Sequence, residues 1–150
     1  MGAPNNRALP VAAYSPTRRD EYTQSLGIQT DLQLTAHQEE IIAALRDEVA
    51  GAGDVDTVIF SSEHIHSRLT TEGEVERLHR LVENLPFEEI DVIVYLREQV
   101  ACVESLYSTA VLFGGRTDPP PPPGTEEYWD NICDHRRTLV RYRDVFGTAN

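Results

Sequence analysis

Two short apolar runs rich in β-branched residues constrain the fold more than any other feature. Residues 55–61 (VDTVIFS) form the first run, and residues 91–96 (DVIVYL) form the second. Both have the composition of β-strands. The second run is continuously apolar rather than alternating, which is typical of a strand covered on both faces. The two runs therefore predict a parallel sheet.

Amphipathic helical patterns surround the two runs. They cover residues 36–50, 72–84 and 98–113, and a last helix is expected over residues 126–146. Thr35 is predicted to cap the first of these helices, and Thr70 or Thr71 the second. The order helix, strand, helix, strand, helix makes a βαβ unit with a right-handed crossover. We therefore expect an α/β fold, a partial parallel sheet flanked by helices.

The remaining segments suggest one incomplete domain. The length of 150 residues fits a single domain. Two strands make a thin sheet, however, so residues 1–150 are expected to be part of a larger α/β domain.

Two segments are predicted to lie outside helices and strands. Residues 1–35 are predicted to be irregular because Pro4, Pro10 and Pro16 interrupt regular structure. Residues 118–125 contain five consecutive prolines and are predicted to be an exposed spacer, or a ligand for an aromatic groove.

The charged residues exclude several functions. Lys and Arg total 13, all of them Arg, against 25 Asp and Glu, which gives a net charge of −12. A Walker-type phosphate loop and a Schiff-base enzyme both need a Lys, so neither can be built. The acidic balance argues against nucleic-acid binding, which relies on many cationic contacts to phosphate.

Cysteine and histidine spacing indicates no metal site. Cys102 and Cys133 form no CxxC pair, and the five histidines do not supply zinc spacing. A reduced, cytoplasmic protein is therefore expected. No stretch approaches the ~20 apolar residues of a membrane span.

Arg97 and Ser105 are candidates for binding a phosphate group. Arg97 follows the second predicted strand, and Ser105 comes eight residues later. A guanidinium group suits a phosphate, and the predicted helix start adds free backbone N–H groups and a positive dipole end. The alternative is a surface ion pair of Arg97 with Glu98 or Glu104. Both interpretations remain open from the residues alone.

These segments resemble bacterial sulfotransferases. Residues 95–99 (YLREQ) and 105–108 (SLYS) are similar to the family's Arg-x7-Ser segment, residues 61–64 (SSEH) to a stretch after an earlier strand, and residues 145–147 (VFG) to a C-terminal segment. The resemblance implies a P-loop-like α/β fold. It also implies that Arg97 and Ser105 hold the 3′-phosphate of the co-substrate 3′-phosphoadenosine 5′-phosphosulfate. Intact relatives transfer its sulfuryl group to a hydroxyl or amine, here of a carbohydrate or lipid.

The resemblance also identifies Glu63 and His64 as candidates for the general base that deprotonates the acceptor. The alternative is that Glu63 caps a turn or pairs with Arg68, and that His64 is a packed or hydrogen-bonded histidine. The family's Lys-containing loop for the 5′-phosphosulfate has no match in the sequence. We therefore expect a domain truncated at its N-terminus and C-terminus, without sulfotransferase activity on its own.

A function of another class remains open. The Pro-rich segment 118–125, or an uncovered edge of the predicted sheet, would allow a non-catalytic interaction module. An uncovered edge also makes a homodimer plausible, because unpaired strand edges bind other chains.

Overall fold

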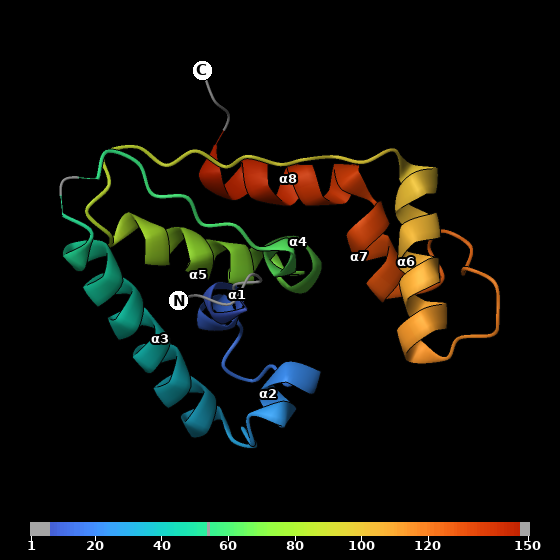
Figure 1. The fold of residues 1–150 in the computed structure, drawn as a ribbon, viewed down its shortest axis with the longest axis horizontal. Coiled ribbons are helices and arrows are strands. Elements are labelled where there is room, and N and C mark those ends of the chain that lie inside the picture. Colours follow the sequence, from blue (N-terminus) through green and yellow to red (C-terminus); the bar gives the residue numbers. More distant parts are fainter. Residues whose placement is uncertain (1–6, 54, 148–150) are drawn as a thin grey trace. The chain divides into compact units, whose positions relative to one another are not determined.

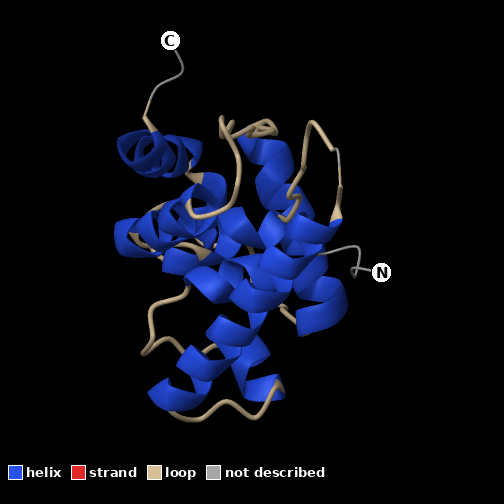
Figure 2. Cartoon of the chain, turned by 90° about the vertical axis from the view of Figure 1, so that its left-hand side faces the viewer, coloured by secondary structure: helices blue, strands red, loops and turns tan. Residues whose placement is uncertain are grey.

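The computed structural model describes residues 7–53 and 55–147, and all its regular elements in these ranges are helices (Figures 1 and 2). The expected α/β fold is therefore wrong, and the described residues contain no strand and no P-loop-like sheet. A parallel strand needs a neighbour that exchanges backbone hydrogen bonds along its length. Both apolar runs, residues 55–61 and 91–96, instead lie outside regular structure.

The chain divides into two compact units, Met1–Ile90 and Asp91–Asn150. The first unit contains α1 (Ala8–Ala13), α2 (Glu21–Ser25), α3 (Asp31–Gly51), α4 (Glu63–Arg68) and α5 (Glu72–Glu83). The second contains α6 (Gln99–Gly114), α7 (Glu127–Cys133) and α8 (His135–Phe146).

Helix α1 is the centre of the first unit, although it lies in the segment expected to be irregular. It packs against α3, α4 and α5, and its last five residues are all buried. Pro10 is tolerated because it lies in the first turn, where backbone N–H groups have no partner within the helix. The Gln38 side chain of α3 donates to the carbonyl oxygens of Val11 (2.9 Å) and Tyr14 (3.0 Å), which lie at the end of α1.

Capping residues set the starts of α3 and α5. Helix α3 begins earlier than predicted, because Thr30 rather than Thr35 caps it and forms a reciprocal capping box with Gln33. It ends at Gly51, next to the expected end at residue 50. The prediction of α5 is confirmed, including its cap, since Thr71 forms a capping box with Glu74.

The second unit has a small core. The predicted helix over residues 98–113 is confirmed as α6. The predicted helix over residues 126–146 is instead two helices, because Asp134 interrupts it and its carboxylate accepts from the Arg137 N–H at the start of α8. Trp129 of α7 and Tyr142 of α8 are the large apolar side chains buried here. The Pro-rich segment 118–125 lies outside the helices, as predicted.

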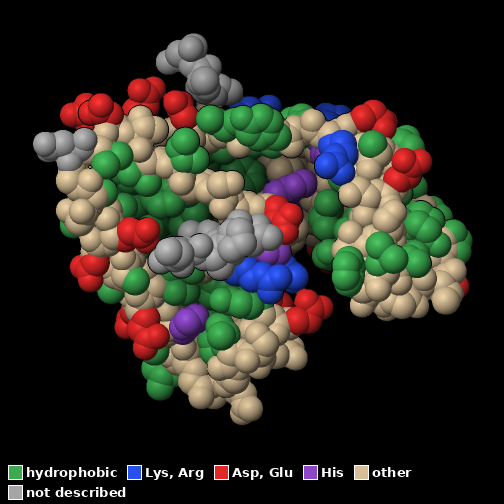
Figure 3. Space-filling view, viewed as in Figure 1, with side chains coloured by type: hydrophobic (Ala, Val, Ile, Leu, Met, Phe, Trp, Pro, Cys, Tyr) green, Lys and Arg blue, Asp and Glu red, His purple; other side chains and the backbone are tan. Residues whose placement is uncertain are grey.

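Helix α6 has no buried residue in this structure. Val100 and Val111 of this helix are both exposed. Leu112 and Phe113, near the end of the helix, are exposed as well, and Figure 3 shows hydrophobic side chains on this surface. The second unit thus keeps an apolar surface open.

Candidate functional site

The predicted site residues fall in both units. Glu63 and His64 belong to the first unit, and Arg97 and Ser105 belong to the second. The candidate residues therefore form two groups, each within its own unit.

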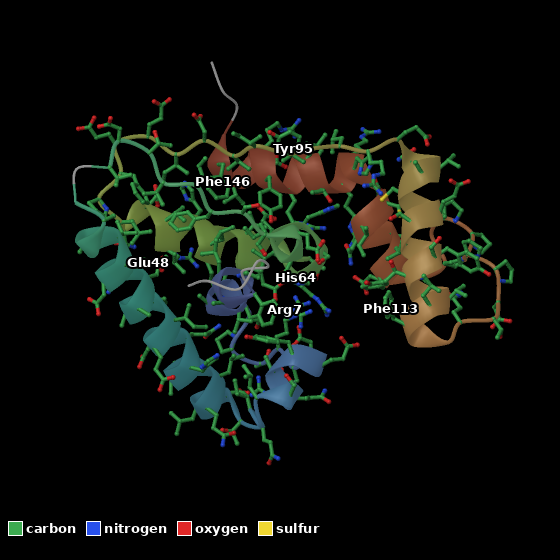
Figure 4. The ribbon with its side chains drawn as sticks, in the orientation of Figure 1. Arg7, Glu48, His64, Tyr95, Phe113 and Phe146 are labelled. Carbon is green, nitrogen blue, oxygen red and sulfur yellow. The ribbon has the colours of Figure 1, made fainter. Side chains whose placement is uncertain are left out.

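His64 lies in the first turn of α4 and is largely buried, with 12% of its side chain exposed. The Arg7 Nε–H donates to His64 Nε2 at 3.1 Å, and Figure 4 shows these two side chains together. Burial and then the charge of Arg7 lower the pKa of His64, against the opposing effect of Glu63. His64 is therefore neutral at physiological pH, but the lone pair on its Nε2 is already engaged. It is a hydrogen-bonded histidine, as the alternative interpretation expected.

Glu63 is the first residue of α4, and 70% of its side chain is exposed. Its Oε1 lies 3.8 Å from His64 Nε2, which is too far for a hydrogen bond. Arg68, the alternative partner expected for Glu63, forms its ion pairs with Asp20 (3.7 Å) and Glu21 (3.5 Å). The cap of α4 is Ser62, whose Oγ accepts from the His64 backbone N–H.

A buried ion pair near this helix was not anticipated from the sequence. The Arg18 Nη1 donates to both carboxylate oxygens of Glu74, at 2.8 and 2.9 Å. Glu74 is only 2% exposed and also accepts from the backbone N–H groups of Thr70 and Thr71. Every carboxylate oxygen thus has partners within the chain. The T-x-x-E pattern at residues 71–74 is a capping-box signal that could have pointed to Glu74, but no sequence pattern points to Arg18.

A second polar pair lies beside the first. The Tyr14 hydroxyl donates to Asp20 Oδ2 at 2.7 Å, and the Arg18 guanidinium lies 4.5 Å from the Tyr14 ring centroid. Burial and the hydrogen bond to Asp20 raise the pKa of Tyr14. Burial acts to raise the pKa of Asp20, but hydrogen bonds from Thr23 and Tyr14 outweigh it and lower that pKa. These side chains interact with one another within the chain. Their arrangement therefore stabilises the fold and does not indicate a catalytic site.

Arg97 precedes α6 and is exposed. Its carbonyl oxygen accepts from His135 Nε2 at 2.7 Å, which fixes the backbone at this position. Its guanidinium forms neither of the expected ion pairs with Glu98 and Glu104 among the described residues. The cationic group therefore remains accessible to a ligand.

The start of α6 is already occupied by a carboxylate. Glu98 is the N-cap residue, and its Oε2 accepts from the Ala101 N–H at 2.9 Å. Hydrogen bonds from the backbone of Val100 and Ala101 lower the pKa of Glu98. The backbone N–H groups that were expected to bind a phosphate thus donate to the Glu98 carboxylate instead. This carboxylate also places a negative charge next to Arg97 in the sequence.

Ser105 lies on α6 and is exposed. The helical rise of 1.5 Å per residue places it about 9 Å along the axis from Gln99. The Ser105 carbonyl accepts from the Thr109 hydroxyl at 3.1 Å. Arg97 and Ser105 therefore keep the order that the sequence indicated, with a helix start between them, but their side chains do not contact each other.

The hollows of the first unit were not predicted from the sequence. A cavity next to His64, lined also by Arg7, Tyr22 and Arg68, has a volume of about 10 Å³, enough for one water molecule at most. A larger groove of about 280 Å³ lies between α3 and α5, where Arg46, Arg77 and Arg80 surround apolar residues. Arg77 and Arg80 make contacts within their own helix, to Gly73 and Glu76.

Neither a metal site nor a membrane-spanning helix is found in the described ranges. Residues 7–53 and 55–147 contain no group of three or more His, Cys, Asp or Glu side chains placed to hold a metal ion. None of the helices in the same ranges is long and apolar enough to cross a membrane.

Comparison with known proteins gives no neighbour. No protein-family model matches the chain, and no curated protein or solved structure matches it either.

Proposed function

We propose that this chain binds the 3′-phosphate of a nucleotide sulfate donor, 3′-phosphoadenosine 5′-phosphosulfate, through Arg97 and Ser105. The observation that carries the proposal is the accessible guanidinium of Arg97 directly before a helix that presents an exposed Ser105. A guanidinium forms bidentate hydrogen bonds to phosphate oxygens, and a hydroxyl adds another donor. The proposal concerns this local segment and does not require a sheet.

The resemblance to bacterial sulfotransferases supplies the identity of the ligand. The family's pattern is an Arg at the end of a strand and a Ser eight residues later. Here Arg97 follows a segment without regular structure rather than a strand, and Ser105 lies eight residues later on α6, so only the spacing and the following helix support the proposal. In this proposal the nucleotide contacts Arg97 and the exposed side of α6, because Glu98 occupies the backbone N–H groups of the first turn.

Sulfuryl transfer by the chain alone is not part of the proposal. The sequence contains no Lys to bind the 5′-phosphosulfate. Arg7 engages His64 Nε2, and Glu63 is exposed. Transfer to a carbohydrate or lipid acceptor would therefore need groups that these residues do not supply.

Calorimetry with adenosine 3′,5′-bisphosphate tests the proposal. We expect binding to the wild type, and a loss of about 10-fold or more in affinity for Arg97→Ala, because a charge-assisted hydrogen-bond pair contributes roughly 1.5–3 kcal/mol. Arg136→Ala is the matched control, since Arg136 is another exposed arginine of the second unit. Adenosine 5′-monophosphate, which lacks the 3′-phosphate, should bind more weakly.

Two results would contradict the proposal. One is an absence of heat at millimolar bisphosphate. The other is equal affinity of the wild type and Arg97→Ala, combined with a loss of binding in Arg77→Ala. The latter would assign anion binding to the groove between α3 and α5.

A second candidate function is self-association through the apolar surface of the second unit. Tyr95 is 94% exposed and Phe113 is 86% exposed, and several neighbours on residues 91–96 and on α6 are also exposed. Large exposed apolar side chains are candidates for an interaction surface. We propose a second copy of the chain as the partner, because unpaired extended segments of identical sequence can pair with one another. Sedimentation across a concentration series tests this, and a monomer at all concentrations would contradict it.

A further inference from the structure

The two cysteines lie together in the second unit. Cys102, in the first turns of α6, and Cys133, the last residue of α7, have their Sγ atoms 3.9 Å apart. Both thiols are reduced and half-buried. They are separated by 31 positions in the sequence and share no metal-binding or redox motif, so no sequence pattern indicates this pair.

Hydrogen bonds on both sides hold the pair in place. The Gln99 Nε2 donates to the Cys133 carbonyl oxygen at 3.2 Å, and His135 Nε2 donates to the Arg97 carbonyl oxygen at 2.7 Å. Helix α6 also packs against α7 (Figure 1). The start of α6 is thus attached to the end of α7 and the start of α8, and the two thiols lie between these attachments.

We propose that Cys102 and Cys133 are a redox modification site. The two residues form a disulfide bond with each other when a small-molecule disulfide such as oxidised glutathione oxidises them. A disulfide requires a sulfur–sulfur distance of about 2.05 Å. Side-chain rotation about the two Cα–Cβ bonds, with a small approach of α6 to α7, closes the remaining distance. This proposal does not depend on nucleotide binding.

The exchange proceeds in two balanced steps. The Cys102 thiolate attacks one sulfur of oxidised glutathione, forms a mixed disulfide, and releases one glutathione thiolate. Cys133 then loses its proton and attacks the Cys102 sulfur, which releases the second glutathione thiolate. The two protons from the cysteines end on the two glutathione molecules. The protein thiols are oxidised, and oxidised glutathione is reduced.

The direction of the thiol hydrogen bond makes Cys102 the attacking group. The Cys133 thiol donates to Cys102 Sγ. Burial, followed by the nearby Cys102, raises the pKa of Cys133 to about 11, so Cys133 keeps its proton until the second step.

The test equilibrates the full chain with mixtures of oxidised and reduced glutathione. We expect the loss of both free thiols, a mass lower by two hydrogen atoms, and a linked peptide pair containing Cys102 and Cys133. The oxidised chain should run as a monomer on a non-reducing gel. Its thermal midpoint should rise by roughly 10 °C or more, because the bond closes a loop of about 30 residues.

Single-cysteine variants separate the pair from isolated reactive thiols. Cys133→Ser should accumulate a stable glutathione adduct at Cys102, whereas the wild type should show only the internal disulfide. The proposal is overturned if the wild type keeps both thiols at equilibrium with a large excess of oxidised over reduced glutathione. It is equally overturned if the wild type retains glutathione adducts or forms disulfide-linked dimers. Mass mapping of the wild type decides this even where a serine variant fails to fold.

Discussion

Arg18 Nη1 lies 2.8 Å from Glu74 Oε1, and this ion pair joins the segment after α1 to the start of α5. Glu74 is nearly inaccessible to solvent, whereas 21% of the Arg18 side chain is exposed. The same carboxylate caps α5 through its contacts with Thr70 and Thr71. One side chain thus fixes both a helix start and a contact across the first unit.

Replacing Glu74 by Ala should destabilise the chain strongly. The change leaves Arg18 without its partner and removes acceptors from two backbone N–H groups, so we expect a loss of about 2–4 kcal/mol in the free energy of unfolding. Chemical denaturation followed by circular dichroism measures it. Glu76→Gln is the matched control, because Glu76 pairs with Arg80 at the surface, and it should change the stability by less than about 0.5 kcal/mol. A similar effect of both substitutions would argue against the buried pair.

Gln38 offers a second test of the first unit. Its amide donates to two carbonyl groups at the end of α1 and is buried. Gln38→Ala should therefore cost about 1–3 kcal/mol in the free energy of unfolding, since it leaves buried acceptors without a donor. The exposed Gln24 is the control, and Gln24→Ala should be near neutral. Equal stability of Gln38→Ala and the wild type would mean that α1 is not held in this way.

The protonation of His64 should make stability depend on pH. Burial and Arg7 lower its pKa below the usual 6.5, so the unfolded chain binds the proton more readily than the folded chain. Neutral His64 makes its full contribution to the free energy of unfolding above pH 6.5. That contribution is lost as the pH falls from 6.5 through the lowered pKa of the folded chain. Protonation also breaks the hydrogen bond from Arg7.

Unfolding free energies measured between pH 7.5 and pH 5 check this expectation. They should fall for the wild type, and His64→Gln should reduce the slope because it removes the titrating group. His37→Gln is the control at another histidine of the first unit. An unchanged slope in His64→Gln would contradict the proposed role of burial and Arg7.

The starts of α5 and α6 and the loop over residues 118–125 could be predicted from the sequence, because capping residues and proline act locally. Thr71 was one of the two candidate caps for α5, and it caps the helix. Helix α1 was missed because Pro10 was taken as a helix breaker, although the first turn needs no N–H at that position. The break at Asp134 was missed because the apolar periodicity continues through it.

The strand predictions failed for a different reason. Residues 55–61 and 91–96 have strand composition, but composition does not supply the neighbouring strand that a sheet requires. Among the site residues, the sequence indicated Arg97 as a candidate and left open whether it binds a phosphate or forms a surface ion pair. It did not indicate that Glu98 fills the start of α6, that Arg7 engages His64, or that Cys102 lies beside Cys133. Each of these depends on side-chain positions or contacts between distant segments.

The cap at the start of α6 gives a prediction about ligand affinity. Glu98→Gln removes a negative charge next to Arg97 in the sequence, so adenosine 3′,5′-bisphosphate should bind about fivefold more tightly, corresponding to about 1 kcal/mol of repulsion in water. Glu104→Gln, farther along the helix, is the control for a simple change of net charge. Calorimetry of the two variants measures the difference, and equal gains would point to net charge alone.

The exposed end of α6 can be tested for self-association. A Leu112→Ser, Phe113→Ser double variant should raise the dimer dissociation constant by at least about tenfold. Burying each of the two apolar side chains contributes about 2 kcal/mol to the free energy of association, and the variant loses these contributions. Leu32→Ser changes an exposed leucine of the first unit and is the matched control. Sedimentation velocity measures both. A dimer that persists unchanged in the double variant would place the interface elsewhere.

Amide and arginine side-chain NMR spectra during a titration with adenosine 3′,5′-bisphosphate test nucleotide binding most directly. We expect saturable shifts of Arg97 Nε–H and of the amide of Ser105, and we expect Arg97→Ala to abolish the shift at Ser105. Shifts confined to Arg46, Arg77 and Arg80, or no saturable shifts at millimolar ligand, would contradict it.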